Sequence, residues 1–138
     1  MKSTESLIRW LVVVDTNVFV SAFIWGGQPG IVVKKWLKGK FILLLSPFLL
    51  SEIILVLARF GFSQRDLQKI RHILEDNSLK NFPKKEVKLC RDKKDNQILD
   101  HCLAGKADFL VTGNKDLLTI KRFHQTQILT PREFLTKT

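Results

Sequence analysis

The chain has 138 residues, of which 45% are hydrophobic, and this composition suits a globular protein with a core and excludes a disordered chain. Its net charge of +10 at pH 7 favours a polyanionic partner such as a nucleic acid over an inert basic surface. No apolar run reaches the roughly 20 residues of a membrane span, and the apolar stretch at 7–14 lacks a signal-peptide cleavage site, so we expect a cytoplasmic protein that has no membrane contact.

The N-terminal third predicts one strand and two helices. The continuous apolar run at 11–14 is typical of a central parallel strand, which is buried on both faces. A short helix is expected over 18–23, and the Gly- and Pro-rich residues 26–30 predict a loop. The next helix ends at Gly39, and its predicted core face carries Ile31, Val32, Trp36 and Leu37.

The middle of the chain predicts a second strand followed by a helical hairpin. Residues 41–45 favour a buried strand, and Ser46 is typical of the N-cap of the helix that follows. That helix, 47–60, is apolar on almost all sides, so we expect it to be buried. The polar residues 77–85 predict a loop. Between them, Ser63 begins a helix whose predicted core face carries Leu67, Ile70 and Leu74.

The last third predicts shorter elements that continue the alternation of strands and helices. Such alternation favours right-handed βαβ units and one α/β domain built on a parallel sheet. In chain order the expected elements are a strand at 87–89, a helix from Asp95 to Gly105 with Ile98, Leu99, Cys102 and Leu103 on its core face, a strand at 109–112, a turn at 113–116, a strand at 127–129 and a helix from Pro131.

This topology directs four acidic side chains to one edge of the predicted sheet. Asp15 directly follows the first strand, and Asp116 lies just past the strand that ends at Thr112. Asp95 and Glu52 lie near the N-termini of helices that begin at that same carboxyl edge, where ligands of open α/β sheets bind. Taken singly, each aspartate could equally be a helix cap or a turn residue. Glu52 is harder to explain, because a carboxylate on a nearly apolar helix is costly to bury unpaired.

The four acids are more informative together than singly. Two carboxylates about 4 Å apart repel by roughly 4 kcal/mol at an effective dielectric of 20, so such a group needs protons or a cation. Oxygen-only ligands favour Mg²⁺ or Mn²⁺, whereas the cysteines and histidines, none at ligand spacing, argue against zinc. Basic residues beside the acids are the best candidates to contact a phosphodiester substrate: Arg91, Lys93, Lys94 and Lys115.

Four segments in order resemble the PIN domain ribonucleases over roughly residues 11–134. They are Val12-Val13-Val14-Asp15-Thr16-Asn17-Val18, Ser51-Glu52, Arg91-Asp92-Lys93-Lys94-Asp95-Asn96 and Val111-Thr112-Gly113-Asn114-Lys115-Asp116-Leu117. Residues 21–30 also resemble the group regarded as toxins of bacterial toxin–antitoxin systems.

The resemblance implies a PIN-like fold in which helices flank both faces of a central parallel sheet, as one domain over 1–138 with its core at about 11–135. It implies Mg²⁺- or Mn²⁺-dependent endonucleolytic hydrolysis of RNA, a cognate antitoxin protein and a homodimer. By position, Asp15, Glu52 and Asp95 match the family's acidic trio, and Asp116 matches its more variable fourth acid. The expected metal ligands are Asp15, Asp95 and Asp116, supported by Asn17, Thr112 and Asn114.

One departure leaves an alternative open. Many relatives carry aspartate where this chain has Asn114, which lowers the negative charge and puts occupancy by two metals in doubt. The alternative is therefore a catalytically weak PIN-fold module that binds RNA or protein. A phosphotransfer domain of similar topology is a further rival, although the haloacid-dehalogenase type needs an aspartate where this chain has Asn17.

Overall fold

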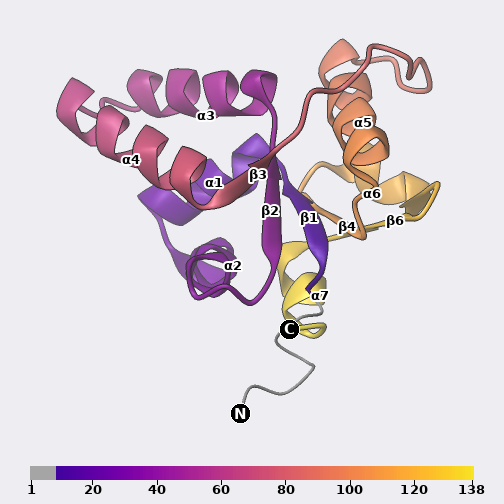
Figure 1. Cartoon of the computed structure of the whole chain (residues 1–138), viewed down its shortest axis with the longest axis horizontal. Helices are drawn as coiled ribbons and strands as arrows, with labels where there is room; N and C mark the ends of the chain where they lie inside the picture. The colour runs from indigo at the N-terminus through magenta and orange to yellow at the C-terminus, as the bar shows by residue number, and fades with distance from the viewer. Residues whose placement is uncertain (1–8) are drawn as a thin grey trace.

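A sheet of six strands forms the centre of the computed structural model, which describes residues 9–138 (Figure 1). The strand order is β3-β2-β1-β4-β6-β5, and only β5 and β6 pair antiparallel. The predicted α/β class is confirmed, but the sheet is mixed rather than parallel because β5 turns back along β6. The strands are β1 (Leu11–Val14), β2 (Ile42–Leu45), β3 (Ser78–Lys80), β4 (Phe109–Val111), β5 (Arg122–Phe123) and β6 (Thr126–Leu129).

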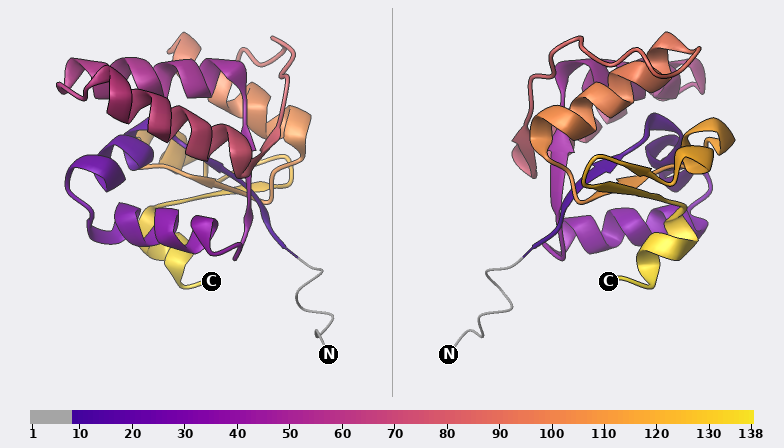
Figure 2. Two further views of the ribbon diagram at one scale, coloured as in Figure 1. Left: turned by 60° about the vertical axis from the view of Figure 1, so that its left-hand side comes forward. Right: turned by 90° about the vertical axis from the view of Figure 1, so that its right-hand side faces the viewer.

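Helices cover both faces of this sheet. Figure 2 (right) shows α5 on one face and both α2 and α7 on the other. Helices α3 and α4 pack side by side, which confirms the predicted hairpin between β2 and β3. The helices of the described residues are α1 (Thr16–Ile24), α2 (Gly27–Leu37), α3 (Pro47–Arg59), α4 (Gln64–Asp76), α5 (Lys93–Gly105), α6 (Lys115–Ile120) and α7 (Pro131–Leu135).

The strands that carry the site are rigidly held in the core. Val12 and Val13 of β1 are fully buried, and they pair in parallel register with Leu43 of β2 and Leu110 of β4. Burying each such aliphatic side chain contributes about 1.5–3 kcal/mol. Phe134 of α7 closes one face of the core. The ends of β1 and β4 therefore form a fixed platform for the residues that follow them.

No helix within residues 9–138 combines the length and the apolar character needed to cross a membrane. The first residues of the apolar stretch at 7–14, judged above for a signal peptide, lie outside the part of the chain that the structure describes. Both cysteines are free: Cys90 is half-buried and Cys102 is buried.

Two helices differ from their predicted form. The loop expected at 26–30 is wrong, because α2 begins at Gly27 and holds Pro29 in its first turn, where the missing amide hydrogen has no helical partner to lose. The side chains that α2 and α3 bury also differ from those that the apolar pattern of the sequence predicted. On α2, Ile31 and Leu37 are exposed, and Val33 is buried instead. On α3, which was expected to be buried on all sides, Leu55 is 52% exposed.

The long connection before α5 was also predicted wrongly. The loop expected at 77–85 contains β3, whose polar sequence reflects its position at the edge of the sheet. The strand expected at 87–89 does not form. Instead, the buried carboxylate of Asp100 accepts hydrogen bonds from the backbone N–H groups of Glu86 and Val87 at 3.0 and 2.8 Å. The Asp100 side chain thus accepts hydrogen bonds from backbone N–H groups of this segment, which we expected to pair with a neighbouring strand.

Candidate active site

An acidic cleft of about 210 Å³ opens at the carboxyl edge of the sheet. Three elements bring acids to it, because β1 ends just before Asp15 while Glu52 and Asp95 lie in α3 and α5. The turn after β4 adds Asn114. The full lining is Asp15, Asn17, Phe48, Glu52, Val56, Asp92, Lys94, Asp95, Ile98 and Asn114.

Asp15 is both a helix cap and a member of the cleft. Its Oδ1 accepts a hydrogen bond of 2.8 Å from the N–H of Thr16 as the N-cap of α1, and its Oδ2 accepts one of 2.7 Å from the Thr112 hydroxyl. Burial raises the pKa of the Asp15 carboxyl, the two hydrogen bonds oppose that shift, and the charges of Glu52 and Asp95 add to it. Asp15 therefore caps α1 and lines the acidic cleft at the same time, so the two roles considered for it are compatible.

Asp95 lies in the first turn of α5 and is only 6% exposed. It does not cap the helix, which corrects the start predicted there: α5 begins at Lys93, and Asp92 is the N-cap through a 2.8 Å bond from the N–H of Lys94. Burial raises the pKa of the Asp95 carboxyl, and the charges of Asp92 and Asp116 raise it further. A cation in the cleft would favour the ionised form of this acid.

A chain of hydrogen bonds joins Asp15 to Asp95. The buried Thr112 hydroxyl donates to Asp15 and accepts from the N–H of Asn114 at 3.0 Å. The Asn114 Nδ2 in turn donates to Asp95 Oδ1 at 2.9 Å, while its Oδ1 accepts from the N–H of Asp116 at 2.9 Å as the cap of α6. An amide at position 114 therefore bonds to Asp95, where an ionised aspartate would repel it.

The oxygen atoms that line the cleft suit a hard cation such as Mg²⁺, because they belong to carboxylate and amide side chains. Glu52 is half-buried, and its charge acts on Asp15. Apolar side chains of Phe48, Val56 and Ile98 complete the wall. Among residues 9–138, however, no three Asp, Glu, His or Cys side chains lie close enough together to hold one ion.

Comparison with known proteins identifies the family. Residues 11–116, most of the chain, match the family described as PIN domain. The chain belongs to the PIN domain family. PIN domains are in general nucleases, which are hydrolases, and PIN nucleases generally bind RNA and use divalent metals.

Two further similarities accord with a PIN domain. The uncharacterized protein MJ1680 of Methanocaldococcus jannaschii is 29% identical, over 93% of this chain and 91% of that protein. The crystal structure of PAE2754 from Pyrobaculum aerophilum superposes with a TM-score of 0.58 at 14% identity, over 94% of this chain and 88% of that one. This structural likeness shows the fold.

The PIN cleft gathers some of the residues predicted from the sequence and leaves others outside. Asp15, Asn17, Glu52, Asp95, Asn114 and Lys94 line it, and Thr112 lies directly behind Asp15. The remaining predicted residues are exposed and do not line it, although the charge of Asp116 still raises the pKa of Asp95. These are Arg91, Lys93, Lys115 and Asp116.

Some residues of the PIN cleft were missed or undervalued. Asp92, which precedes Asp95 in the same motif, was not among the predicted site residues, yet both line the cleft. The spacing of these two acids, with Asp92 three residues ahead, is the signal of an N-cap followed by an acidic first turn. The apolar wall, which includes Phe48, carried no such signal because its pattern is that of any core-facing helix.

Proposed function

We propose that this PIN domain is a divalent-metal-dependent endoribonuclease that hydrolyses phosphodiester bonds of RNA in the acidic cleft. The observation that carries the proposal is the convergence of Asp15, Glu52 and Asp95 from three separate elements on one cleft at the carboxyl edge. The net charge of +10 supports a polyanionic substrate.

In this proposal Asp15, Glu52 and Asp95 would bind Mg²⁺ or Mn²⁺ in part through water molecules held between the carboxylates and the ion, which suits their oxygen chemistry and does not require all three to contact one ion directly. When bound, the ion supplies charge neutralisation at the phosphoryl group and lowers the pKa of water. Asp116 is the fourth acid and a further candidate ligand; it is exposed, and its charge acts on Asp95. Asn17 and Asn114 supply amide groups to the wall of the cleft.

The surrounding residues have supporting roles. Thr112 holds the Asp15 carboxylate through its 2.7 Å hydrogen bond and is a positioning residue. Lys94, which lines the cleft, contacts a phosphate of the substrate. The exposed Arg91, Lys93 and Lys115 contact phosphates further along the strand. Phe48, Val56 and Ile98 form the apolar part of the wall beside the acids.

A toxin role with a cognate antitoxin protein and a homodimer belongs to the same proposal, and it rests on the resemblance of residues 21–30. Exposed apolar side chains support contact with another protein. Trp25 is 71% exposed and Phe60 is 55% exposed, and their rings meet edge to face at 6.1 Å. The chain's mass in solution, alone and after co-expression with the neighbouring gene product, tests both partners.

A second candidate function has its own support. The absence of three closely spaced metal-ligating side chains within residues 9–138, together with the bond between Asn114 and Asp95, favours a PIN module that binds RNA or protein without cleaving it. This candidate predicts RNA binding that weakens steeply with salt and no cleavage in either metal.

The deciding experiment incubates a labelled RNA with the protein in Mg²⁺, in Mn²⁺ and in excess chelator. The proposal expects cleavage with metal, none with chelator, and none by Asp15→Asn. Asp66→Asn is a matched control, because Asp66 is an exposed acid of α4 outside the cleft. Equal cleavage in chelator, or full activity of Asp15→Asn, would refute the proposal.

A further inference from the structure

A second feature of the carboxyl edge is an exposed aromatic side chain on a fixed backbone. Phe82 follows β3 and is 71% exposed. The preceding residue, Asn81, is buried and holds the segment from both sides: its N–H donates to the Leu45 carbonyl at 2.8 Å, and its Nδ2 donates to the His101 carbonyl at 2.8 Å. The ring is therefore presented to solvent from a position that the core determines.

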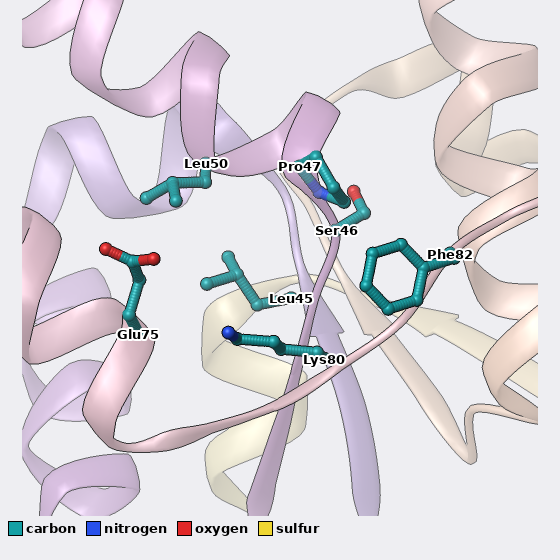
Figure 3. Close-up of a pocket in the computed structure, with 7 residues that line it drawn as sticks. All are labelled: Leu45, Ser46, Pro47, Leu50, Glu75, Lys80 and Phe82. Atoms are coloured by element: carbon teal, nitrogen blue, oxygen red, sulfur yellow. The ribbon is translucent and has the colours of Figure 1, made fainter.

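Hollows adjoin this ring on two sides. The first, of about 180 Å³, has an apolar floor, and Figure 3 shows the ring beside Ser46 and Pro47, Glu75 across the hollow from it, and Lys80 extending from β3 toward Glu75. It is lined by Leu45, Ser46, Pro47, Leu50, Glu75, Lys80 and Phe82. The second, of about 360 Å³, is more polar and includes Asn81, Phe82, Lys84, Glu86 and Asp100. An aromatic ring flanked in this way has the geometry of a stacking platform.

The Phe82 segment leads to the acidic cleft. A small hollow lined in part by Pro83, Lys84 and Lys85 also includes Phe48, which lines the acidic cleft as well. In the sheet, β3 lies two strands from β1, so Lys80 is roughly 10 Å from the end of β1 at a strand spacing of about 4.8 Å. Phe82 is thus within reach of a strand bound in the cleft.

The charges around Phe82 indicate what binds there. Lys80, Lys84 and Lys85 are exposed and lie within a few residues of the ring. Alternation of lysines with an aromatic side chain is typical of single-stranded nucleic acid sites, in which bases stack and cations follow the backbone. Acids also lie near the ring: Glu75 lines the first hollow, and Glu86 and Asp100 line the second. Asp100 already accepts two backbone hydrogen bonds, whereas the Glu75 carboxylate can accept hydrogen bonds from the N–H groups of a base edge.

We propose that Phe82 and the hollow beside it form a base-binding subsite for a nucleotide that neighbours the scissile phosphate of single-stranded RNA. The base stacks on Phe82 with its edge toward Glu75, and Lys80, Lys84 and Lys85 contact the adjoining phosphates. The proposal rests on the proposed ribonuclease function for its substrate, but it concerns binding, which is measured without metal and without cleavage.

The test measures binding of a fluorescent single-stranded RNA in chelator, by polarisation, to the full chain. Phe82→Ala should bind roughly 5- to 150-fold more weakly, which is the range for losing one stacked base. Phe82→Trp should restore binding. Leu37→Ala is the control, because Leu37 is also an exposed apolar side chain but lies at the C-terminal end of α2, at the amino edge of the sheet. Thermal unfolding of each variant checks that the exposed ring does not affect folding.

A second oligonucleotide separates the base from the phosphates. On an abasic ribose-phosphate chain, Phe82→Ala should bind as well as the wild type, whereas Lys80→Ala should still bind more weakly. Lys38→Ala is the control for charge, because Lys38 follows α2 at the opposite, amino edge of the sheet.

The outcomes separate this proposal from the nuclease proposal. If Phe82→Ala binds RNA as tightly as Leu37→Ala and the wild type do, the subsite is refuted, and a protein segment becomes the better occupant of the hollow. If the wild type binds RNA with the predicted dependence on Phe82 but never cleaves it in Mn²⁺, the subsite stands and the nuclease proposal fails. If the wild type binds no RNA in chelator, the subsite is refuted, whereas the nuclease proposal is still decided by cleavage in Mn²⁺.

Discussion

The substitution Thr112→Val tests the hydrogen-bond chain behind the acidic cleft. Valine matches the shape of threonine but removes the hydroxyl, which donates to Asp15 at 2.7 Å and accepts from the N–H of Asn114 at 3.0 Å. A hydrogen bond to a charged group contributes about 1.5–3 kcal/mol, and leaving the half-buried N–H of Asn114 without this partner adds to the loss. We expect Thr112→Val to lower the free energy of unfolding by about 3 kcal/mol at neutral pH.

Thr126→Val is a matched control within the same chain. Thr126 is equally buried, and its hydroxyl donates at 2.7 Å to the neutral carbonyl of Ala107, so this variant should lose about 1 kcal/mol. Urea unfolding measures both. Removing the bond from Thr112 should also move the already raised pKa of Asp15 further up, which carbon-detected NMR titration follows. Equal losses for the two variants, with no change in the pKa of Asp15, would refute the role assigned to Thr112.

Three further changes follow from burial and packing. The pKa of Asp95 is raised above 3.8, so the native state binds this proton more tightly and stability falls as the pH rises through the native pKa; Asp95→Asn should therefore unfold at a higher temperature than the wild type at neutral pH, with the gain vanishing below pH 3.8. Burial lowers the pKa of His101 from 6.5 to about 4, so the unfolded state binds more protons between these values and stability falls on acidification; His101→Leu should remove roughly 3 kcal/mol of that loss, and unchanged pH dependence in chemical unfolding would contradict this. A Cβ on Gly105 would lie 2.6 Å from Leu44 Cδ1 and 2.8 Å from the Asn81 amide nitrogen, so Gly105→Ala should destabilise the fold by about 1–3 kcal/mol, while Gly113→Ala, which meets nothing within 4 Å, should not, as calorimetry would show.

The fold was predictable wherever local pattern and burial agree. Continuous apolar runs identified β1, β2 and β4, because central strands are buried on both faces. Edge strands were missed, since β3 and β5 are short and solvent-exposed and form only because a neighbouring strand pairs with them. Residues 26–30 were predicted as a loop although α2 begins there. Gly and Pro are typical both of loops and of the first turn of a helix, so composition alone does not separate the two.

The candidate site was predictable in its acids but not in its connections. Position relative to strand ends placed Asp15, Glu52 and Asp95 at one edge, and the structure gathers them there. Sequence spacing could not show that Asn114 donates to Asp95, because that bond joins residues 19 apart through the tertiary fold. Sequence spacing likewise predicted only a polar loop around Phe82. The hydrogen bond that holds this segment joins Asn81 to His101, which lies 20 residues away.

The most direct test of the central claim, that three acids act as one catalytic unit, compares RNA cleavage rates in Mn²⁺ for single and combined variants. We expect Asp15→Asn, Glu52→Gln and Asp95→Asn each to lose at least roughly 100-fold, and the triple variant to be little slower than the worst single one, because residues that act as a unit are strongly non-additive. Near-wild-type cleavage by any folded single variant, or losses that multiply independently, would contradict the claim.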